Sequence, residues 1–177
     1  MKFLLTAFSK DRPGIVADIS QVIFENGYNL EDSSMTYLAD EFAILLLLSA
    51  PASAKENEVL EKLSIECRRL ERDKNITAYV RRASGDSTSP PKNGNVKTIS
   101  VEGLDQAGIV YKVSRYLADQ NINIRTLKSK VRQSPQSGGD LYSMKIETDI
   151  PTELSLQQVE DGLDSIGNSL NVDITFN

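Results

Sequence analysis

The chain has 177 residues, of which 40% are hydrophobic and 25% charged, and its formal net charge is −5. This composition is typical of an ordinary folded protein, and the acidic balance argues against general binding of nucleic acid. Because the sequence contains no histidine, it excludes His-based general bases, Ser-His-Asp triads and histidine metal sites. We predict no metal site and no cofactor.

A single cysteine, Cys67, rules out an intramolecular disulfide, and its apolar helical neighbours predict a small core side chain. No segment approaches the roughly 18 apolar residues that span a membrane, and the N-terminus lacks a signal-peptide pattern. We therefore expect a cytoplasmic protein without membrane contact. The arginines around Arg68 are interleaved with acidic residues, which favours a solvated helix face over a nucleic-acid site.

Hydrophobic periodicity predicts six elements in the first half of the chain. An alternating segment at residues 2–9 predicts a strand, and an apolar stripe from Ile15 to Ile23 predicts an amphipathic helix. Two strands, a helix and a last strand follow, at residues 29–38, 41–50, 55–72 and 76–81. Residues 42–48 are apolar at every position, so we expect their second face to be covered by the other half or by another chain.

The second half repeats this order after a polar stretch. Residues 83–95 are rich in Ser, Gly and Pro and predict a linker. A strand, a helix, two strands, a helix and a strand are then expected, at residues 96–103, 109–117, 123–131, 140–148, 155–169 and 172–176. The hairpin at residues 132–139 is longer than its counterpart at residues 39–40, which favours a disordered loop over a lid.

The two halves also match in sequence. Residues 11–30 align without gaps to residues 105–124, and six of the 20 positions are identical, namely Asp11/Asp105, Gly14/Gly108, Ile15/Ile109, Val16/Val110, Ser20/Ser114 and Asn29/Asn123. Gly27 and Asn121 stand at equivalent places just after the first helix of each half. Both residue types tolerate the left-handed conformation that ends a helix. The repeat is therefore structural rather than compositional.

Each half follows the order β-α-β-β-α-β, which predicts the α+β class with two ferredoxin-like domains, each an antiparallel sheet with helices on one face. The expected boundaries are residues 1–82 for the first domain, 83–95 for the linker and 96–177 for the second domain. The second strand of such a sheet lies at an edge. We expect these two edge strands to pair into one eight-stranded sheet, with face-to-face packing as the alternative.

Each half places the pattern Asp-x-x-Gly between its first strand and its first helix. We predict that Asp11 and Asp105 cap these helices by accepting from the backbone N–H of Gly14 and Gly108. Glycine costs roughly 0.5–1 kcal/mol relative to alanine inside a helix, so its presence suggests that another group approaches the backbone closely. A helix N-terminus suits a carboxylate, and Asp and Asn side chains suit an ammonium group. From the residues alone, ligand binding and simple loop geometry both stay open.

The segment Asp-Arg-Pro-Gly-Ile-Val at residues 11–16, followed by Asn29 at the start of the next strand, resembles an ACT domain. Asp-Gln-Ala-Gly-Ile-Val at residues 105–110, followed by Asn123, resembles a second one. The resemblance implies a regulatory protein that binds a small amino acid, such as glycine or serine, between paired domains. It implies that the ligand-binding residues are Asp11, Gly14, Ile15, Asn29, Asp105, Gly108, Ile109 and Asn123.

Two ACT domains with nothing else resemble the glycine cleavage system transcriptional repressor group. This resemblance implies regulation of amino-acid metabolism through a protein partner, such as a transcription factor or a metabolic enzyme, without direct contact to nucleic acid. A homodimer stays open. A ligand-free protein-interaction module is the alternative.

Two further functions fit the same element order less well. An acylphosphatase-like enzyme needs a glycine-rich anion loop beside an arginine, but the loop at Arg12 has one glycine and the second half has Gln106 at that place. RNA binding needs exposed aromatic residues on the middle strands, and Tyr142 is the candidate on the third strand of the second half. We therefore predict no enzymatic activity.

Overall fold

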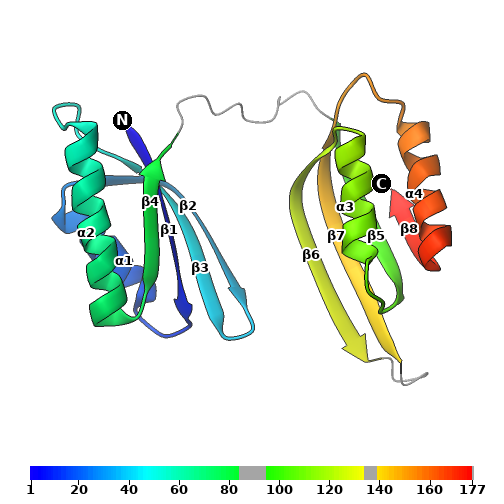
Figure 1. Cartoon of the computed structure of the whole chain (residues 1–177), viewed down its shortest axis with the longest axis horizontal. Coiled ribbons are helices and arrows are strands. Elements are labelled where there is room, and N and C mark those ends of the chain that lie inside the picture. Colours follow the sequence, from blue (N-terminus) through cyan, green and yellow to red (C-terminus); the bar gives the residue numbers. More distant parts are fainter. Residues whose placement is uncertain (84–94, 134–138, 177) are drawn as a thin grey trace. The chain divides into compact units, whose positions relative to one another are not determined.

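The computed structural model describes residues 1–83, 95–133 and 139–176. The chain divides into two compact units, Met1–Ser87 and Thr88–Asn177, each with its own hydrophobic core (Figure 1). The division falls within the predicted linker. Residues 84–94 of that linker lie outside the described residues, so the linker and the exact domain boundaries stay predictions.

The first unit has the order β-α-β-β-α-β. Its elements are β1 (Lys2–Lys10), α1 (Ile15–Glu25), β2 (Asn29–Leu38), β3 (Glu41–Ser49), α2 (Glu56–Lys74) and β4 (Thr77–Arg82). The four strands form one antiparallel sheet in the order β2-β3-β1-β4. β2 is therefore an edge strand, as the sequence predicts.

The second unit repeats this topology. Its elements are β5 (Asn95–Leu104), α3 (Ile109–Asp119), β6 (Asn123–Gln133), β7 (Asp140–Ile150), α4 (Leu156–Leu170) and β8 (Val172–Phe176), and the sheet order is β6-β7-β5-β8. The prediction of two ferredoxin-like βαββαβ domains is confirmed. β6 and β7 each run two residues further than predicted, and residues 134–138 of the hairpin loop lie outside the described residues.

Alternation along the strands separates two faces of each sheet. In β1, Phe3, Leu5 and Ala7 are buried, and the residues between them face the other way. Both helices of the unit cover the first face (Figure 1) and add their apolar stripes to the same core, namely Ile15, Ile19, Ile23, Val59, Leu63, Cys67 and Leu70. Each large apolar side chain buried there contributes roughly 1.5–3 kcal/mol. Alternate side chains of the strands and the apolar stripes of both helices thus form one core.

Cys67 is buried in that core, as predicted, and desolvation raises the pKa of its thiol to about 11. The neighbouring arginines pair with acidic residues on the exposed side of α2. Arg69 lies 2.7 Å from Glu66, and Arg72 lies 2.6 Å from Asp73. These pairs fit a solvated helix face. None of the described helices combines the length and the apolar character needed to cross a membrane.

The first helix of each unit ends at the predicted stop signals. Gly27 has φ 72° and Asn121 has φ 56°, so both adopt the left-handed conformation. The second helices end in the same conformation at Asn75 and Asn171. Glycine and asparagine adopt it at little cost, and the chain can therefore leave each helix sharply toward the next strand.

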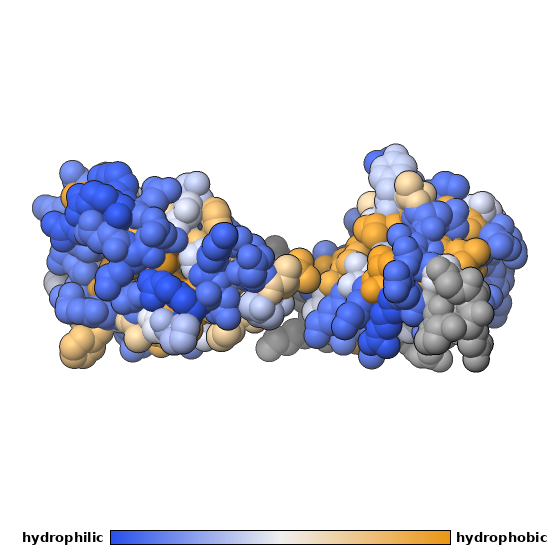
Figure 2. Space-filling view, turned by 90° about the horizontal axis from the view of Figure 1, so that it is seen from below, coloured by the Kyte–Doolittle hydropathy of each residue, from blue (hydrophilic) through white to orange (hydrophobic). Residues whose placement is uncertain are grey.

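The apolar run at residues 42–48 is divided between the two faces of the first sheet. Four of its side chains are buried under the helices, namely Phe42, Ile44, Leu46 and Leu48. Ala43, Leu45 and Leu47 lie on the opposite, open face, where Leu45 keeps 46% of its surface exposed. That another surface covers this open face stays a prediction. Hydrophilic residues dominate the surface seen in Figure 2, with apolar residues in smaller groups between them.

Tyr142 does not present its ring on the open face of the second sheet. It pairs with Gly103 and Val131 on the helix-covered side and is 8% exposed. The requirement for an exposed aromatic residue, which RNA binding would impose, is therefore not met by Tyr142.

A β-bulge interrupts each edge strand near its start and leaves one residue out of the pairing: Glu31 in β2 and Arg125 in β6. Glu31 Oε2 lies 2.6 Å from Nζ of Lys2. Arg125 donates through Nε to Oδ2 of the buried Asp149 at 2.6 Å, and its Nη2 lies 2.6 Å from Oδ1. The equivalent bulge residue is thus an acid in one unit and a base in the other. Each is held to its own sheet.

Candidate functional site

The loop between the first strand and the first helix is held by its backbone. The N–H of Asp11 donates to the carbonyl oxygen of Asp40 at 2.8 Å, and the N–H of Asp105 donates to that of Asp140 at 2.8 Å. Neither aspartate side chain caps a helix, because α1 and α3 begin after a glycine N-cap without a side-chain hydrogen bond. The prediction that Asp11 and Asp105 are N-caps is therefore wrong.

The two glycines take the N-cap position in a left-handed conformation, with φ 92° at Gly14 and φ 99° at Gly108. A Cβ atom at Gly108 would meet nothing within 4 Å, and one at Gly14 would lie 3.8 Å from the guanidinium of Arg12. Lack of space is not what requires glycine. The left-handed backbone, which costs other residues roughly 1–2 kcal/mol, is sufficient. Loop geometry thus accounts for the glycines, and ligand binding stays untested.

The first turn of each helix leaves backbone donors free. The N–H of Asp18 donates to the carbonyl oxygen of Gly14 at 2.8 Å, and the N–H of Lys112 donates to that of Gly108 at 2.9 Å. The three N–H groups before each of these, at residues 15–17 and 109–111, precede the first intrahelical hydrogen bond. They lie at the positive end of the helix dipole, where an anion is stabilised.

Ile15 and Ile109 are each 2% exposed and pack in the cores. Of these two predicted site residues, only the backbone N–H can therefore reach a ligand. Asn29 and Asn123 are exposed at the starts of β2 and β6.

Within a unit, the loop and the asparagine are far apart. Asn29 pairs with Ser49, and Ser49 pairs with Lys2, at the end of β1 that is remote from Asp11. A strand of nine residues such as β1 is about 30 Å long. Asn123 is placed in the same way relative to its loop. A single unit therefore does not bring all of its predicted site residues together.

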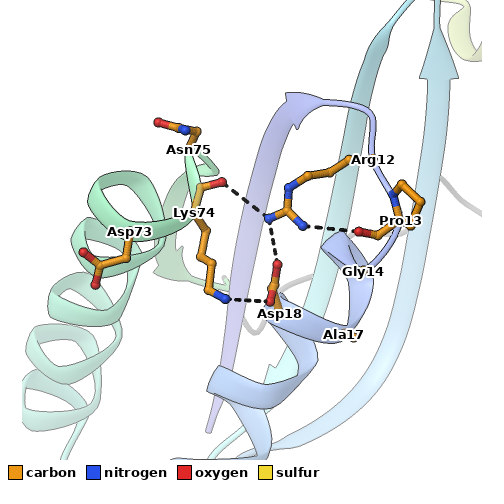
Figure 3. A pocket seen from close by; sticks show the side chains of 8 residues that line it. All are labelled: Arg12, Pro13, Gly14, Ala17, Asp18, Asp73, Lys74 and Asn75. Carbon is orange, nitrogen blue, oxygen red and sulfur yellow. Dashed lines mark hydrogen bonds and ion pairs between the residues drawn. The ribbon is translucent and has the colours of Figure 1, made fainter.

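An open pocket of about 490 Å³ lies beside the first loop, between α1 and the C-terminal end of α2 (Figure 3). It is lined by Arg12, Pro13, Gly14, Ala17, Asp18, Asp73, Lys74 and Asn75. Arg12 donates to Oδ2 of Asp18 at 2.7 Å and to the carbonyl oxygens of Pro13 and Lys74 at 3.3 and 3.4 Å. Lys74 Nζ lies 3.2 Å from Oδ1 of Asp18. The carboxylate of Asp18 thus forms ion pairs with both Arg12 and Lys74 beside the loop.

Sequence reasoning missed Asp18 and Lys74 as members of this pocket. Lys74 reaches Asp18 from another helix, and no local pattern in the sequence records that approach. For Arg12, the sequence suggests only the anion-binding arginine of an acylphosphatase-like enzyme. Its guanidinium is occupied by one carboxylate and two carbonyl oxygens, which argues against that chemistry.

The second unit keeps the backbone of the site but not its charges. The Gln106 side chain donates to the carbonyl oxygen of Leu170 at the end of α4, as Arg12 does at the end of α2. Lys112 stands at the place of Asp18. The shared features are therefore the loop, the left-handed glycine and the free helical N–H groups. Within the described residues, no group of three or more His, Cys, Asp or Glu side chains could hold a metal ion.

Comparison with known proteins identifies the family. An ACT domain model matches residues 2–75. The glycine cleavage system transcriptional repressor of Escherichia coli (strain K12) is 24% identical over 174 residues, which cover 98% of this chain and 88% of that protein. A UPF0237 protein of Neisseria meningitidis (serogroup A) is 32% identical over 71 residues, which cover 40% of this chain and 79% of that protein.

Among solved structures, the crystal structure of an unknown protein from Galdieria sulphuraria matches with a TM-score of 0.79 and 27% identity. The match covers 99% of this chain and 96% of that one. Together with the repeated βαββαβ topology, these matches define the class of protein. The chain belongs to the ACT-domain family and carries two ACT modules in tandem.

We expect the loop glycines to tolerate asparagine but not valine. Gly108→Val should lower the free energy of unfolding by about 1–2 kcal/mol, because a β-branched residue is strained at positive φ. Gly108→Asn should lower it less, because asparagine enters the left-handed region more readily. Urea denaturation of both variants measures the difference. Equal losses of stability in the two variants would contradict the explanation by the left-handed backbone conformation.

Stability of the first unit should depend on the ionised Asp18. The hydrogen bond from Arg12, with a contribution from Lys74, lowers the pKa of Asp18, and desolvation opposes this effect. A lowered folded-state pKa means that the stabilisation is present above the unfolded value of about 3.9 and is lost as the pH falls below it. Asp18→Asn should therefore melt at a lower temperature than the parent at pH 7.

The difference in melting temperature should shrink as the pH falls from about 5 to about 3. Thermal unfolding followed by circular dichroism across this range measures it. Glu61→Gln removes a carboxylate from an exposed position of α2 and serves as the matched control. A pH-independent loss in Asp18→Asn would contradict an electrostatic role.

Proposed function

We propose that this protein is a non-catalytic regulator, a cytoplasmic tandem ACT sensor that binds a small amino acid and acts through a protein partner. The observation that carries the proposal is the repeated loop. A left-handed glycine followed by free helical N–H groups stands at the same place in both units, although the side chains around it differ. A backbone geometry that is kept while its surroundings change favours a function that uses the backbone.

The chemistry of the loop fits the two charged ends of an amino acid. The α-carboxylate accepts from the helical N–H groups after Gly14 or Gly108. Asp11 and Asp105 are exposed, and their carboxylates do not cap a helix. Either carboxylate can therefore bind the ammonium group of the ligand. Similarity to a glycine cleavage system transcriptional repressor favours glycine or serine as the ligand and a transcription factor or metabolic enzyme as the partner.

Asn29 and Asn123 lie far from the loops of their own units. An asparagine that contacts the bound amino acid therefore has to come from a neighbouring module. In an antiparallel pair of edge strands, the start of one strand lies beside the end of the other. β2 ends at Leu38, which pairs with Glu41, and Glu41 pairs with Lys10 next to the first loop. Pairing of edge strands thus supports composite sites built from one loop and the asparagine of another module.

The edge strands carry opposite charges. β2 contains two acidic residues, Glu31 and Asp32, and no basic one. β6 contains four basic residues and no acidic one, namely Arg125, Lys128, Lys130 and Arg132. Electrostatic complementarity disfavours pairing of like edges. We propose that β2 of one module pairs with β6 of another, either in the same chain or in a homodimer.

Amino-acid binding should raise the melting temperature of the full chain. We expect glycine or serine to do so in a thermal-shift screen of the twenty amino acids, because a ligand at 100 times its Kd stabilises the native state by about 2.7 kcal/mol. Asn29→Ala and Asn123→Ala should each weaken binding about tenfold, the cost of one charge-assisted hydrogen bond. Asn57→Ala, at an exposed position of α2, is the control.

The absence of a shift with all twenty amino acids would instead support the ligand-free interaction module. In that case the partner-binding function is independent of the loops, and Gly108→Asn should leave it intact.

Hydrogen exchange tests the pairing of the edges. About half of the amides in an unpaired edge strand point away from their own sheet and exchange quickly. If β2 and β6 pair, these amides should be slow in both strands. The measurement is made on the full chain at two salt concentrations, because opposite charges should hold the strands more weakly at high salt. Fast exchange in both strands under both conditions would contradict the pairing.

A further inference from the structure

The open faces of the two sheets have different chemistry, although their backbones match. In the first unit, the central strands β1 and β3 present Leu4, Leu45 and Leu47 on this face, with Leu4 paired to Leu47. In the second unit, the corresponding strands β5 and β7 present Ser100 paired to Lys145, and Thr98 paired to Glu147. The open face of the second unit is therefore polar.

Three lysines gather on this polar face. Lys128 of β6 stands directly opposite Lys145 of β7. Lys130 pairs with Ser143, one row further along the same face. Like charges directly opposite each other on neighbouring strands are destabilising. Folding alone therefore gives no reason to place them together.

None of the three lysines forms an ion pair within the described residues, although Glu102 and Glu147 lie on the same face. No carboxylate oxygen there lies within 4 Å of the ammonium group of Lys128, Lys130 or Lys145 to form an ion pair, whereas Arg125 and Arg115 of the same unit are both paired. The chain has acidic residues to spare, 25 against 20 basic ones. A shortage of counter-charges does not explain the cluster.

The fold does not require lysine at these positions either. At the spacing of the repeat, Ser34 and Thr36 stand where Lys128 and Lys130 stand in the second unit. By strand register, Leu45 opposite Thr6 takes the place of Lys145 opposite Ser100. The first unit forms the same sheet without any of these cations.

The lysines line an open pocket of about 400 Å³ together with Ser100, Ser143 and Glu102. Lysine binds phosphate as a point charge, and the Ser100 hydroxyl can donate a further hydrogen bond to a phosphate oxygen. The hydroxyl of Ser143 donates to the carbonyl oxygen of Lys130 at 3.3 Å. The described lining contains no arginine, so its cations are point charges without the planar fork of a guanidinium group. A phosphoryl group with two or more negative charges would remove the repulsion between Lys128 and Lys145.

We propose that the open face of the second unit binds a small phosphorylated anion through Lys128, Lys130 and Lys145, at a site separate from the amino-acid loops. The small size follows from the pocket. None of the described residues that strand register places on this face is aromatic, so the bases of a nucleic acid would find no ring to stack on. Glu102, which also lines the pocket, can accept a hydrogen bond from a hydroxyl of a small ligand.

Inorganic pyrophosphate is the probe, titrated into the full chain by calorimetry at low salt. We expect saturable binding with one site per chain. Lys128→Ser combined with Lys145→Gln should weaken it at least about tenfold, because two charge-assisted contacts are lost. Lys62→Gln combined with Arg68→Gln removes the same two charges from exposed positions of α2 and should leave the affinity within about twofold. Lys128→Arg with Lys145→Arg should keep most of the binding, since the charges remain.

The melting temperature without ligand gives a second readout. Lys128→Ser with Lys145→Gln should match or exceed the parent at low salt, because the repulsion is relieved. This result also excludes misfolding as the cause of lost binding. Absence of heat up to millimolar pyrophosphate, or equal loss in the α2 control, would overturn the proposal. Citrate binding as tightly as pyrophosphate would overturn the assignment to phosphoryl groups.

The outcome is independent of the amino-acid site. Asn29→Ala and Asn123→Ala should leave pyrophosphate binding unchanged. Lys145→Gln, in the inner strand β7, should leave the response to glycine or serine unchanged, because β7 takes no part in the proposed pairing of edge strands. If the lysine variant alone abolished the response to the amino acid, the two sites would be one, and the proposal of a separate site would be wrong.

Discussion

A left-handed glycine turns the chain from the first strand onto the first helix in both units, and the rest of each unit depends on that turn. It lets Ile15, Ile19 and Ile23 of α1 face the sheet, where they join the core. The same turn leaves the first helical N–H groups without acceptors. One backbone conformation thus serves both packing and the proposed grip on a carboxylate. This is why the loop can stay the same in both units while its side chains differ.

Packing constrains one face of each sheet and leaves the other free to change. The helix-covered side must remain apolar in both units, because each core is buried between two helices and four strands. The open side carries no such requirement, and there Leu45 and Lys145 occupy corresponding places. Similarly, Arg12 and Gln106 reach the end of the second helix with different charges. The two units can therefore share the loop at the start of the first helix and still differ in the chemistry of their open faces.

The two edge strands share a backbone irregularity but differ in charge. Both contain a bulge at the same place, and the bulge residue is Glu31 in one and Arg125 in the other. Each is bound to its own sheet, which keeps the edge in place. With acids on β2 and bases on β6, an edge meets its complement more favourably than its like. In the proposed pairing of β2 with β6, this difference in charge would favour unlike edges over like ones.

The sequence by itself determined the order of elements, the fold class and the repeat, because strand and helix periods and stop signals such as Gly27 and Asn121 act over a few neighbouring residues. It also located the loop that carries the candidate site. It did not determine that Gly14 rather than Asp11 occupies the N-cap, since a dihedral angle follows from how the helix docks on the sheet. It did not place Tyr142 on the buried face or bring Lys74 to Asp18. The tertiary structure decided these points, because strand register and helix contacts join residues whose separation in the chain leaves no local pattern.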